Sequence, residues 1–275
     1  MLVDFHMHSV YSDGIETPKE LLRHALDCNV SMMALTDHDE TDGIKALRTA
    51  QDQLDPEKTI KIINGCEFSA DYKDKSIHIL GYCFDETNKE LRDFIEYFKS
   101  KREERIDEII RRCNNAGYFI SKDELLKKFP KTQAYGRPHI GKLLIDGGYA
   151  KDVNEVFRGI LRKDSPCYVP KVKVEVQHII DIIHKAGGFA VMAHPKLVSS
   201  DEYVLEMLDF DFDGIEVYHS KHNDIDVERY KALAKKHKLF ITGGSDYHGI
   251  PGKEPDNFGD YLVDGNEVSE FISLL

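Results

Sequence analysis

The sequence predicts an α/β fold in which a distorted (β/α)7 barrel is interrupted once by a helical insertion. Short apolar runs typical of strands alternate with helical patterns in residues 1–87 and again in residues 171–275. Between them, residues 88–170 carry helical patterns and no strong strand pattern. No Gly-rich dinucleotide turn follows the first strand, so a closed or distorted barrel fits better than an open doubly wound sheet.

Strands and helices alternate along both parts of the predicted barrel. Strands are expected at residues 2–8, 32–39, 59–70, 76–84, 188–195, 213–220 and 239–248. Helices are expected at residues 17–28, 41–54, 176–188, 203–210, 226–238 and 266–275. The first helix has a clear start signal, because Thr17 is placed to cap it, Pro18 takes its first position and Glu20 completes a capping box. This alternation indicates a parallel sheet.

The insertion is strongly charged and helical. Phe94, Ile95 and Phe98 follow helical spacing, and the same spacing continues further along the segment. Ser121 and Glu124 form a second capping box, and two further short helices are expected at residues 137–149 and 154–163. We expect this segment to serve as a substrate lid.

The composition excludes several classes of protein. A formal net charge of −12 argues against an extended basic surface that binds nucleic acid. Metal ions can still hold a nucleotide or an oligonucleotide end. The apolar runs are too short to span a bilayer, and the N-terminus shows no secretion signal. Five cysteines without CxxC spacing favour reduced thiols in a cytoplasmic protein. No dimerisation element is evident, which favours a monomer.

The first predicted strand ends in His6-Met7-His8. Side chains at i and i+2 of a strand point to one face, so the two imidazoles converge, and imidazole is a good ligand for zinc, iron and similar ions. Other histidine and carboxylate side chains, which are common metal ligands, recur at the ends of the following strands. The candidate metal ligands are His6, His8, Asp13, His38, Glu67, His78, His194, Asp246 and His248. Because the C-terminal ends of barrel strands form one rim, we expect these nine residues to meet there.

The motifs resemble a known family. FHMHSVYSDG, LTDHD, the strand with Glu67, MAHP and GGSDYH are similar in kind and order to the motifs of the polymerase and histidinol phosphatase (PHP) superfamily. The resemblance covers roughly residues 1–85 and 175–250, and GRPHIGKLL within the insertion resembles the subgroup of nucleotide phosphatases and 5′-3′ exoribonucleases. It implies a distorted seven-stranded barrel that carries three divalent metal ions.

The same resemblance implies how the nine residues share the metals. The first metal takes His6, His8, Glu67 and Asp246; the second takes Asp13, His38 and His248; and the third takes Glu67, His78 and His194, with Glu67 as a bridge. Manganese, iron or zinc suits such mixed nitrogen and oxygen sites, and we favour manganese. The ligand types by themselves favour a hydroxide that bridges two metals and attacks phosphorus in line.

Further residues are candidates for contacts with the substrate. Arg137 and His139 open a predicted helix in the insertion, and a helix N-terminus beside an arginine suits a phosphate, although a surface arginine beside a capping histidine explains the pattern too. His219 and His222 follow a strand end, where either can bind a phosphate or protonate the leaving alkoxide, with His219 favoured. Asp13, His194 and His219 are the expected catalytic residues.

The leading hypothesis is therefore a metal-dependent phosphoesterase, a phosphoric ester hydrolase. Its substrate would be a 3′,5′-nucleoside bisphosphate, a mononucleotide or a 5′-phosphorylated short RNA. A histidinol-phosphate phosphatase is the first alternative, against which the long insertion argues. An inactive metal-binding scaffold is the second, against which the chemically complete ligand set argues.

Overall fold

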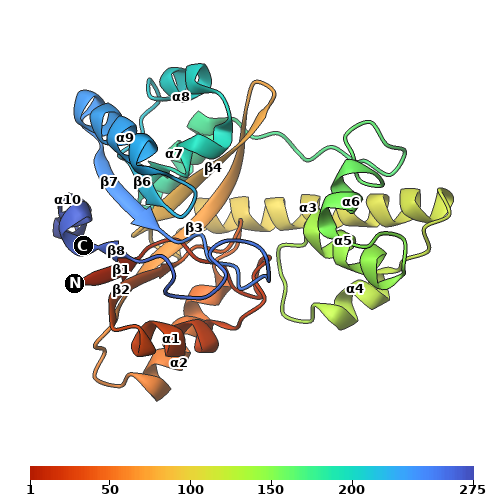
Figure 1. The fold of residues 1–275 in the computed structure, drawn as a ribbon, viewed down its shortest axis with the longest axis horizontal. Helices are drawn as coiled ribbons and strands as arrows, with labels where there is room; N and C mark the ends of the chain where they lie inside the picture. Colours follow the sequence, from red (N-terminus) through yellow and green to blue (C-terminus); the bar gives the residue numbers. More distant parts are fainter. The chain divides into compact units, whose positions relative to one another are not determined.

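A mixed eight-stranded sheet forms the centre of the part of the chain made by residues 1–93 and 173–275 (Figure 1). The computed structural model describes residues 1–275. The strands are β1 (Leu2–Asp4), β2 (Val30–Leu35), β3 (Lys61–Tyr72), β4 (Lys75–Tyr82), β5 (Phe189–Met192), β6 (Gly214–His219), β7 (Phe240–Gly244) and β8 (Val263–Asp264). They follow the order β7-β6-β5-β4-β3-β2-β1-β8 across a sheet that is curled into an almost closed barrel. The predicted fold class is confirmed.

Two strands depart from the parallel sheet that the sequence indicated. Strand β4 runs antiparallel to both β3 and β5, whereas the pairs β1–β2, β2–β3, β5–β6 and β6–β7 are parallel. Only Lys73 and Asp74 separate β3 from β4, and a parallel connection needs a crossover of about a dozen residues or more. The short strand β8, which the sequence pattern did not predict, pairs antiparallel with β1.

The barrel nearly closes where the segment at the end of β7 meets the segment after β1. The Phe5 amide donates to the Gly243 carbonyl at 3.3 Å, and the Asp246 amide donates to the His6 carbonyl at 2.8 Å. A Cβ at Gly244 would lie 2.4 Å from the His6 backbone nitrogen, so only glycine permits this approach. Closure thus brings polar residues from the two ends of the chain side by side.

Helices cover the outside of this barrel (Figure 1). They are α1 (Pro18–Asp27), α2 (Asp42–Leu54), α7 (Val176–Lys185), α8 (Asp201–Met207), α9 (Asp224–His237) and α10 (Ser269–Ser273), with 3-10 turns at Pro195–Val198 and Gly265–Val268. The capping box predicted for α1 is present, because the Glu20 amide donates to Thr17 Oγ1 at 3.3 Å and the Thr17 amide donates to Glu20 Oε2 at 2.7 Å. No helix has both the length and the apolar character needed to cross a membrane.

Apolar side chains fill the barrel beneath its polar rim. Fully buried members of this core are Val3, Phe5, Leu80, Tyr82, Val191 and Phe271. The Tyr82 hydroxyl donates to the Phe5 carbonyl at 2.8 Å, so the one buried hydroxyl among them is satisfied. Burying each such side chain contributes about 1.5–3 kcal/mol, which gives the rim a rigid support.

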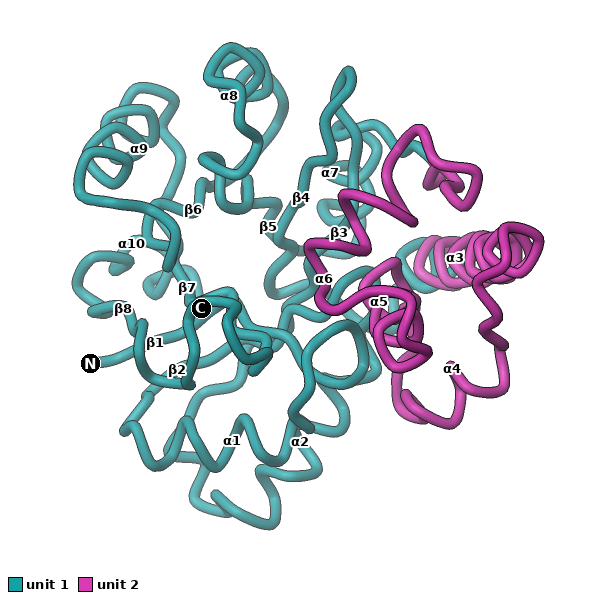
Figure 2. Tube along the Cα trace, turned by 45° about the vertical axis from the view of Figure 1, so that its right-hand side comes forward, with its two compact units in different colours: residues 1–93, 173–275 teal, residues 94–172 magenta.

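The chain divides into two compact units, residues 1–93 with 173–275, and residues 94–172 (Figure 2). The second unit contains most of α3 (Lys89–Asn115) together with α4 (Lys122–Lys128), α5 (Arg137–Asp146) and α6 (Val153–Arg158), and it has its own apolar core. Its limits differ by a few residues from the expected insertion, residues 88–170, because α3 begins at Lys89 in the first unit. The capping box of Ser121 and Glu124 starts α4.

Candidate metal centre

All nine candidate metal ligands lie in the first unit, and the structure brings them together at one rim of the barrel. Most of them follow the C-terminal end of a strand, as the sequence indicated. His78 does not, because β4 runs antiparallel and its N-terminal half reaches this rim. Glu67 lies in the middle of the long strand β3, which extends past its neighbour β2. Antiparallel β4 and long β3 thus supply ligand positions that a simple barrel rim does not.

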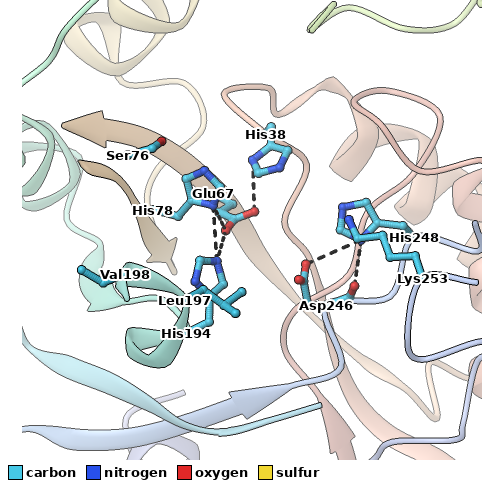
Figure 3. A pocket seen from close by; sticks show the side chains of 10 residues that line it. All are labelled: His38, Glu67, Ser76, His78, His194, Leu197, Val198, Asp246, His248 and Lys253. Atoms are coloured by element: carbon cyan, nitrogen blue, oxygen red, sulfur yellow. Dashed lines mark hydrogen bonds and ion pairs between the residues drawn. The ribbon is translucent and has the colours of Figure 1, made fainter. Parts of the chain in front are cut away.

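Glu67 occupies the centre of the group and is 1% exposed. Its Oε1 lies 2.7 Å from His78 Nδ1 and 2.8 Å from His194 Nε2 (Figure 3). The distances from its Oε2 are 3.0 Å to His38 Nδ1, 3.1 Å to His8 Nε2 and 3.4 Å to His6 Nε2. Five imidazoles from four strands or their ends therefore converge on a single buried carboxylate.

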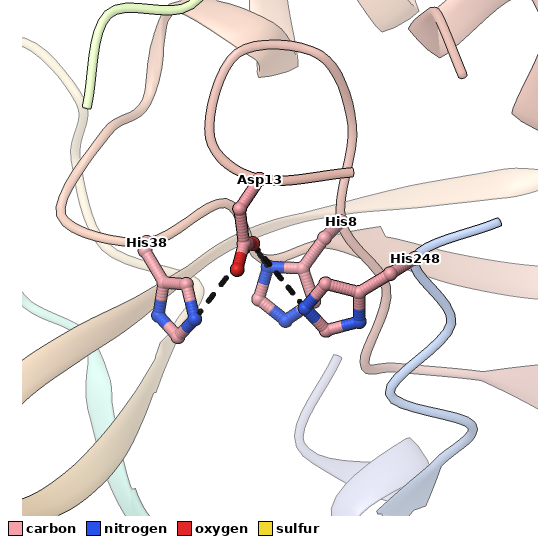
Figure 4. A group of neighbouring side chains, drawn as sticks. All are labelled: His8, Asp13, His38 and His248. Carbon is pink, nitrogen blue, oxygen red and sulfur yellow. Dashed lines mark ion pairs between the residues drawn. The ribbon is translucent and has the colours of Figure 1, made fainter. Parts of the chain in front are cut away.

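Asp13 gathers a second group of imidazoles (Figure 4). Its Oδ1 lies 3.2 Å from His248 Nε2 and 3.9 Å from both His8 Nδ1 and His38 Nε2. The family resemblance implies a group of Asp13, His38 and His248, and the structure adds His8 to this group. His8 and His38 each turn one ring nitrogen toward Asp13 and the other toward Glu67, so the two groups are adjacent.

Asp246 completes the rim from the end of β7. Its Oδ1 lies 3.1 Å from His8 Nε2 and 3.5 Å from His6 Nε2. The residue adopts a φ of 56°, in the left-handed region that costs energy for a side chain other than glycine. The four atoms of His6, His8, Glu67 and Asp246 lie within 4.8 Å of one another, which is the grouping expected for the first metal.

The buried donor and acceptor atoms of this rim fit a cation. His6 Nε2, His8 Nε2, His38 Nδ1, His248 Nε2, Asp13 Oδ1 and Glu67 Oε2 are buried and have no hydrogen-bond partner. They approach one another to 3.0–3.4 Å without hydrogen-bond alignment. Leaving such an atom unsatisfied costs about 1–3 kcal/mol, so six together need a binding partner. Imidazole nitrogen and carboxylate oxygen are ligands that suit zinc, iron and manganese.

Burial and the neighbouring imidazoles together determine the charges of the rim carboxylates. Burial raises the pKa of Glu67, Asp13 and Asp246, but the surrounding imidazoles outweigh burial and hold all three well below the usual range. Burial opposes protonation of His8, yet the Asp246 and Glu67 carboxylates beside it raise its pKa to about 9. Burial lowers the pKa of His38 to about 3. The site therefore keeps its carboxylates ionised and ready to bind cations.

Glu216, which sequence reasoning missed, orients two of the nine residues. Its Oε1 lies 2.9 Å from His6 Nδ1, and its Oε2 accepts the His194 amide at 2.8 Å. The only signal in the sequence was a carboxylate between Ile215 and Val217 in an apolar strand, where a buried charge needs a partner. A carboxylate that holds the far nitrogen of a ligating histidine fixes the ring and its tautomer.

Asp37, a second missed carboxylate, holds the loop that carries Asp13. It accepts the Ser9 amide at 2.8 Å, the Ser9 hydroxyl at 2.7 Å and the Ser12 hydroxyl at 2.6 Å. Its place in LTDHD, directly before His38, was visible in the sequence, but spacing alone does not distinguish a ligand from a support.

His219 is buried beside the rim and presents a donor to it. Its Nδ1 accepts the Lys221 amide at 3.0 Å, so the proton of the neutral ring lies on Nε2. That Nε2 lies 3.5 Å from Asp246 Oδ2. His222 lies farther along the same turn, where its Nδ1 donates to the Val217 carbonyl at 2.8 Å and burial lowers its pKa to about 4. His219, rather than His222, therefore faces the candidate ligands with a proton.

The two candidate residues of the second unit have different surroundings. Arg137 begins α5, and its guanidinium carbon lies 5.3 Å and 5.8 Å from the ring centres of Phe157 and Tyr168. His139 is 2% exposed, and its Nδ1 accepts the Gly136 amide at 3.0 Å. This contact gives His139 a capping function, and its role as a phosphate ligand stays a prediction.

A cavity of about 280 Å³ opens onto this rim (Figure 3). It is lined by His38, Glu67, Ser76, His78, His194, Leu197, Val198, Asp246, His248 and Lys253. Sites for drug-sized ligands typically have volumes of about 300–1,000 Å³, so this one suits a small group such as a phosphoryl group.

Comparison with known proteins gives concordant results. Residues 4–208 match the family described as PHP domain. The chain is 30% identical over 256 residues to a 3′,5′-nucleoside bisphosphate phosphatase from Chromobacterium violaceum, an alignment that covers 91% of this chain and 88% of that protein. It is 30% identical over 253 residues to the 5′-3′ exoribonuclease Rnm from Salmonella typhimurium, with 90% and 85% covered. The crystal structure of a proposed metal-dependent phosphoesterase from Bifidobacterium adolescentis superposes with a TM-score of 0.84 at 29% identity, covering 98% of this chain and 95% of that one.

Proposed function

Given that this chain belongs to the PHP domain family and is a metal-dependent phosphoesterase, we propose that it hydrolyses phosphate esters of nucleotides. The proposed substrate is a 3′,5′-nucleoside bisphosphate, a mononucleotide or a 5′-phosphorylated short RNA. The single observation that carries the proposal is the convergence of five imidazoles on the buried Glu67 carboxylate, beside a cavity that suits a phosphoryl group. The relatives support the nucleotide class, because one acts on a nucleoside bisphosphate and another is an exoribonuclease.

The nine rim residues would hold three divalent ions, with manganese favoured. His6, His8, Glu67 and Asp246 would hold the first, Asp13, His38 and His248 the second, and Glu67, His78 and His194 the third. Supporting this division, the first four residues form one compact group, and His8 joins the second set. When bound, such ions lower the pKa of water toward about 7 and neutralise charge on the phosphoryl oxygens.

The residues of the chain prepare the reacting groups. The rim carboxylates are ionised, and Glu216 keeps His6 turned with Nε2 toward Glu67 and Asp246. Hydrolysis breaks the bond between phosphorus and the ester oxygen and leaves an alkoxide that needs a proton. His219 can donate a hydrogen bond to this oxygen from Nε2, because the Lys221 amide occupies Nδ1, and the proton that the alkoxide takes up balances the one that the attacking water gives up. In this proposal Asp13 and His194 act through the metals that they hold, and His219 acts on the leaving group.

The second unit is proposed to recognise the rest of the nucleotide as a substrate lid. Arg137 is the proposed ligand of a second phosphate, with His139 capping the helix that carries it. Two observations support Arg137: no carboxylate pairs with it, and its guanidinium stacks against Phe157 and Tyr168, which orients its donors.

The experiment is phosphate release by metal-loaded protein. The substrates are a nucleoside 3′,5′-bisphosphate, a mononucleotide, a 5′-phosphorylated short RNA, histidinol phosphate and p-nitrophenyl phosphate, each with added manganese and again after chelation. We expect release from at least one nucleotide substrate, at higher kcat/KM than from histidinol phosphate, and none after chelation. Preference for histidinol phosphate, or activity that survives chelation, would refute the proposal.

A further inference from the structure

Lys253 is the one lysine or arginine among the ten residues that line the cavity at the rim. It lies in the segment that follows His248, in a turn where the Lys253 amide donates to the Ile250 carbonyl at 3.0 Å. Its side chain extends beside His248, near Asp246 (Figure 3). Neither the family motifs nor the nine candidate ligands include this residue.

The ammonium of Lys253 has no partner within the chain. The adjacent carboxylate, Glu254, forms an ion pair with Lys221 instead. The two carboxylates that line the cavity, Glu67 and Asp246, lie 2.7–3.1 Å from imidazole nitrogens. No hydrogen bond or ion pair reaches Lys253 Nζ, although the residue is only partly exposed.

Lys253 lines the same cavity as the rim residues Asp246 and His248. A cation in this position, without a counter-charge of its own, is suited to an anion that enters the cavity.

We infer that Lys253 Nζ binds a non-bridging oxygen of the phosphoryl group that is hydrolysed. This inference rests on the proposed function and adds a substrate-binding residue to it. A phosphate monoester carries about two negative charges near neutral pH, and an ammonium offers three donors on a flexible stem. Lys253 thereby supplies positive charge to the cavity that Glu67 and Asp246 also line.

The test compares Lys253→Met, Lys253→Arg and Lys235→Met with the wild-type protein, all loaded with manganese. Methionine keeps the apolar stem and removes the charge, whereas arginine keeps the charge. Lys235 is an exposed lysine of α9 and serves as a matched control for the same substitution. Three quantities are measured: the affinity for inorganic phosphate by calorimetry, kcat/KM on p-nitrophenyl phosphate and on a nucleoside 3′,5′-bisphosphate, and bound metal.

We expect Lys253→Met to weaken phosphate binding and to lower kcat/KM about ten- to a hundred-fold on both substrates, with metal content unchanged. Lys253→Arg should recover part of this loss, and Lys235→Met should match the wild type. A loss confined to the bisphosphate would overturn the inference, because it would assign Lys253 to the second phosphate. Unchanged phosphate affinity would overturn it as well.

Failure of the proposed function gives a different pattern. Phosphate binding that depends on Lys253, in a protein that hydrolyses none of the substrates, would retain this residue as an anion ligand and refute the proposed reaction. Hydrolysis with the same kcat/KM in Lys253→Met as in the wild type would refute only the inference.

Discussion

Glu216 Oε1 lies 2.9 Å from His6 Nδ1, and both side chains are fully buried. The contact decides which nitrogen of His6 is available, because Nδ1 donates to the carboxylate and Nε2 is left facing Glu67 and Asp246. The other oxygen of Glu216 accepts the amide of His194, a residue with a φ of 25°. One buried carboxylate beneath the rim thus determines how two candidate ligands are presented.

Glu216→Gln should therefore weaken metal binding without removing any ligand. The amide keeps the size of the side chain but loses the charge that holds the Nδ1 proton of His6. Loss of such a support typically costs about ten- to a hundred-fold in metal affinity or activity. Competition with a chromophoric chelator measures the affinity. Wild-type affinity in Glu216→Gln would show that the contact has no part in presenting His6.

Glu67→Gln should have a larger effect, because a neutral amide is a poor bridging ligand. We expect loss of bound metal and of activity, while the circular dichroism spectrum stays that of the folded protein. Glu228→Gln, on the exposed face of α9, is the matched control and should change neither quantity. Full metal content with near-wild-type turnover in Glu67→Gln would exclude the bridging role.

Metal affinity should rise with pH. Burial lowers the pKa of His8, but Asp246 and Glu67 outweigh it and raise the value to about 9, so the metal-free protein holds a proton on this ring at neutral pH. A metal ligand must be unprotonated, so binding displaces this proton, and each pH unit below 9 costs about tenfold in apparent affinity per proton displaced. Affinity measured between pH 6 and pH 8 checks the slope. A flat profile would mean that His8 binds no metal.

Arg137→Ala should lower kcat/KM more for substrates that carry a second phosphate than for those with one. The lost charge-assisted hydrogen bond is worth about 1.5–3 kcal/mol, or roughly ten- to a hundred-fold in kcat/KM. The loss should appear with a nucleoside bisphosphate or RNA end and be small with p-nitrophenyl phosphate, and bound metal should stay constant. Arg162→Ala, an exposed arginine in the same unit, provides the control. Equal losses on both substrates would assign Arg137 to the reacting phosphate instead.

Local signals in the sequence predicted the structure best. Thr17 with Glu20 and Ser121 with Glu124 form the expected capping boxes, because all their atoms lie within four residues of the chain. Apolar periodicity predicted the strands β1 to β7 but not their direction, so the reversal of β4 at Lys73–Asp74 was missed. Strand β8, with two residues, is too short for any pattern.

The candidate site was predictable where residue types follow a known order of motifs, as in His6, His8 and Asp246. The residues that orient the candidate ligands were not predictable. Glu216 contacts His6 across 210 positions of the sequence, and no spacing rule connects residues so far apart. The position of Lys253 was not predictable either. A lysine in a loop pattern is expected at the surface, and only the folded chain places this one in the cavity.

Anomalous diffraction from a manganese-loaded crystal tests the central claim most directly. We expect three peaks at the rim of the barrel: one among His6, His8, Glu67 and Asp246, one beside Asp13, His38 and His248, and one beside His78 and His194, with Glu67 between two of them. A single peak, or peaks away from these side chains, would contradict the trinuclear centre on which the account of phosphoester hydrolysis depends.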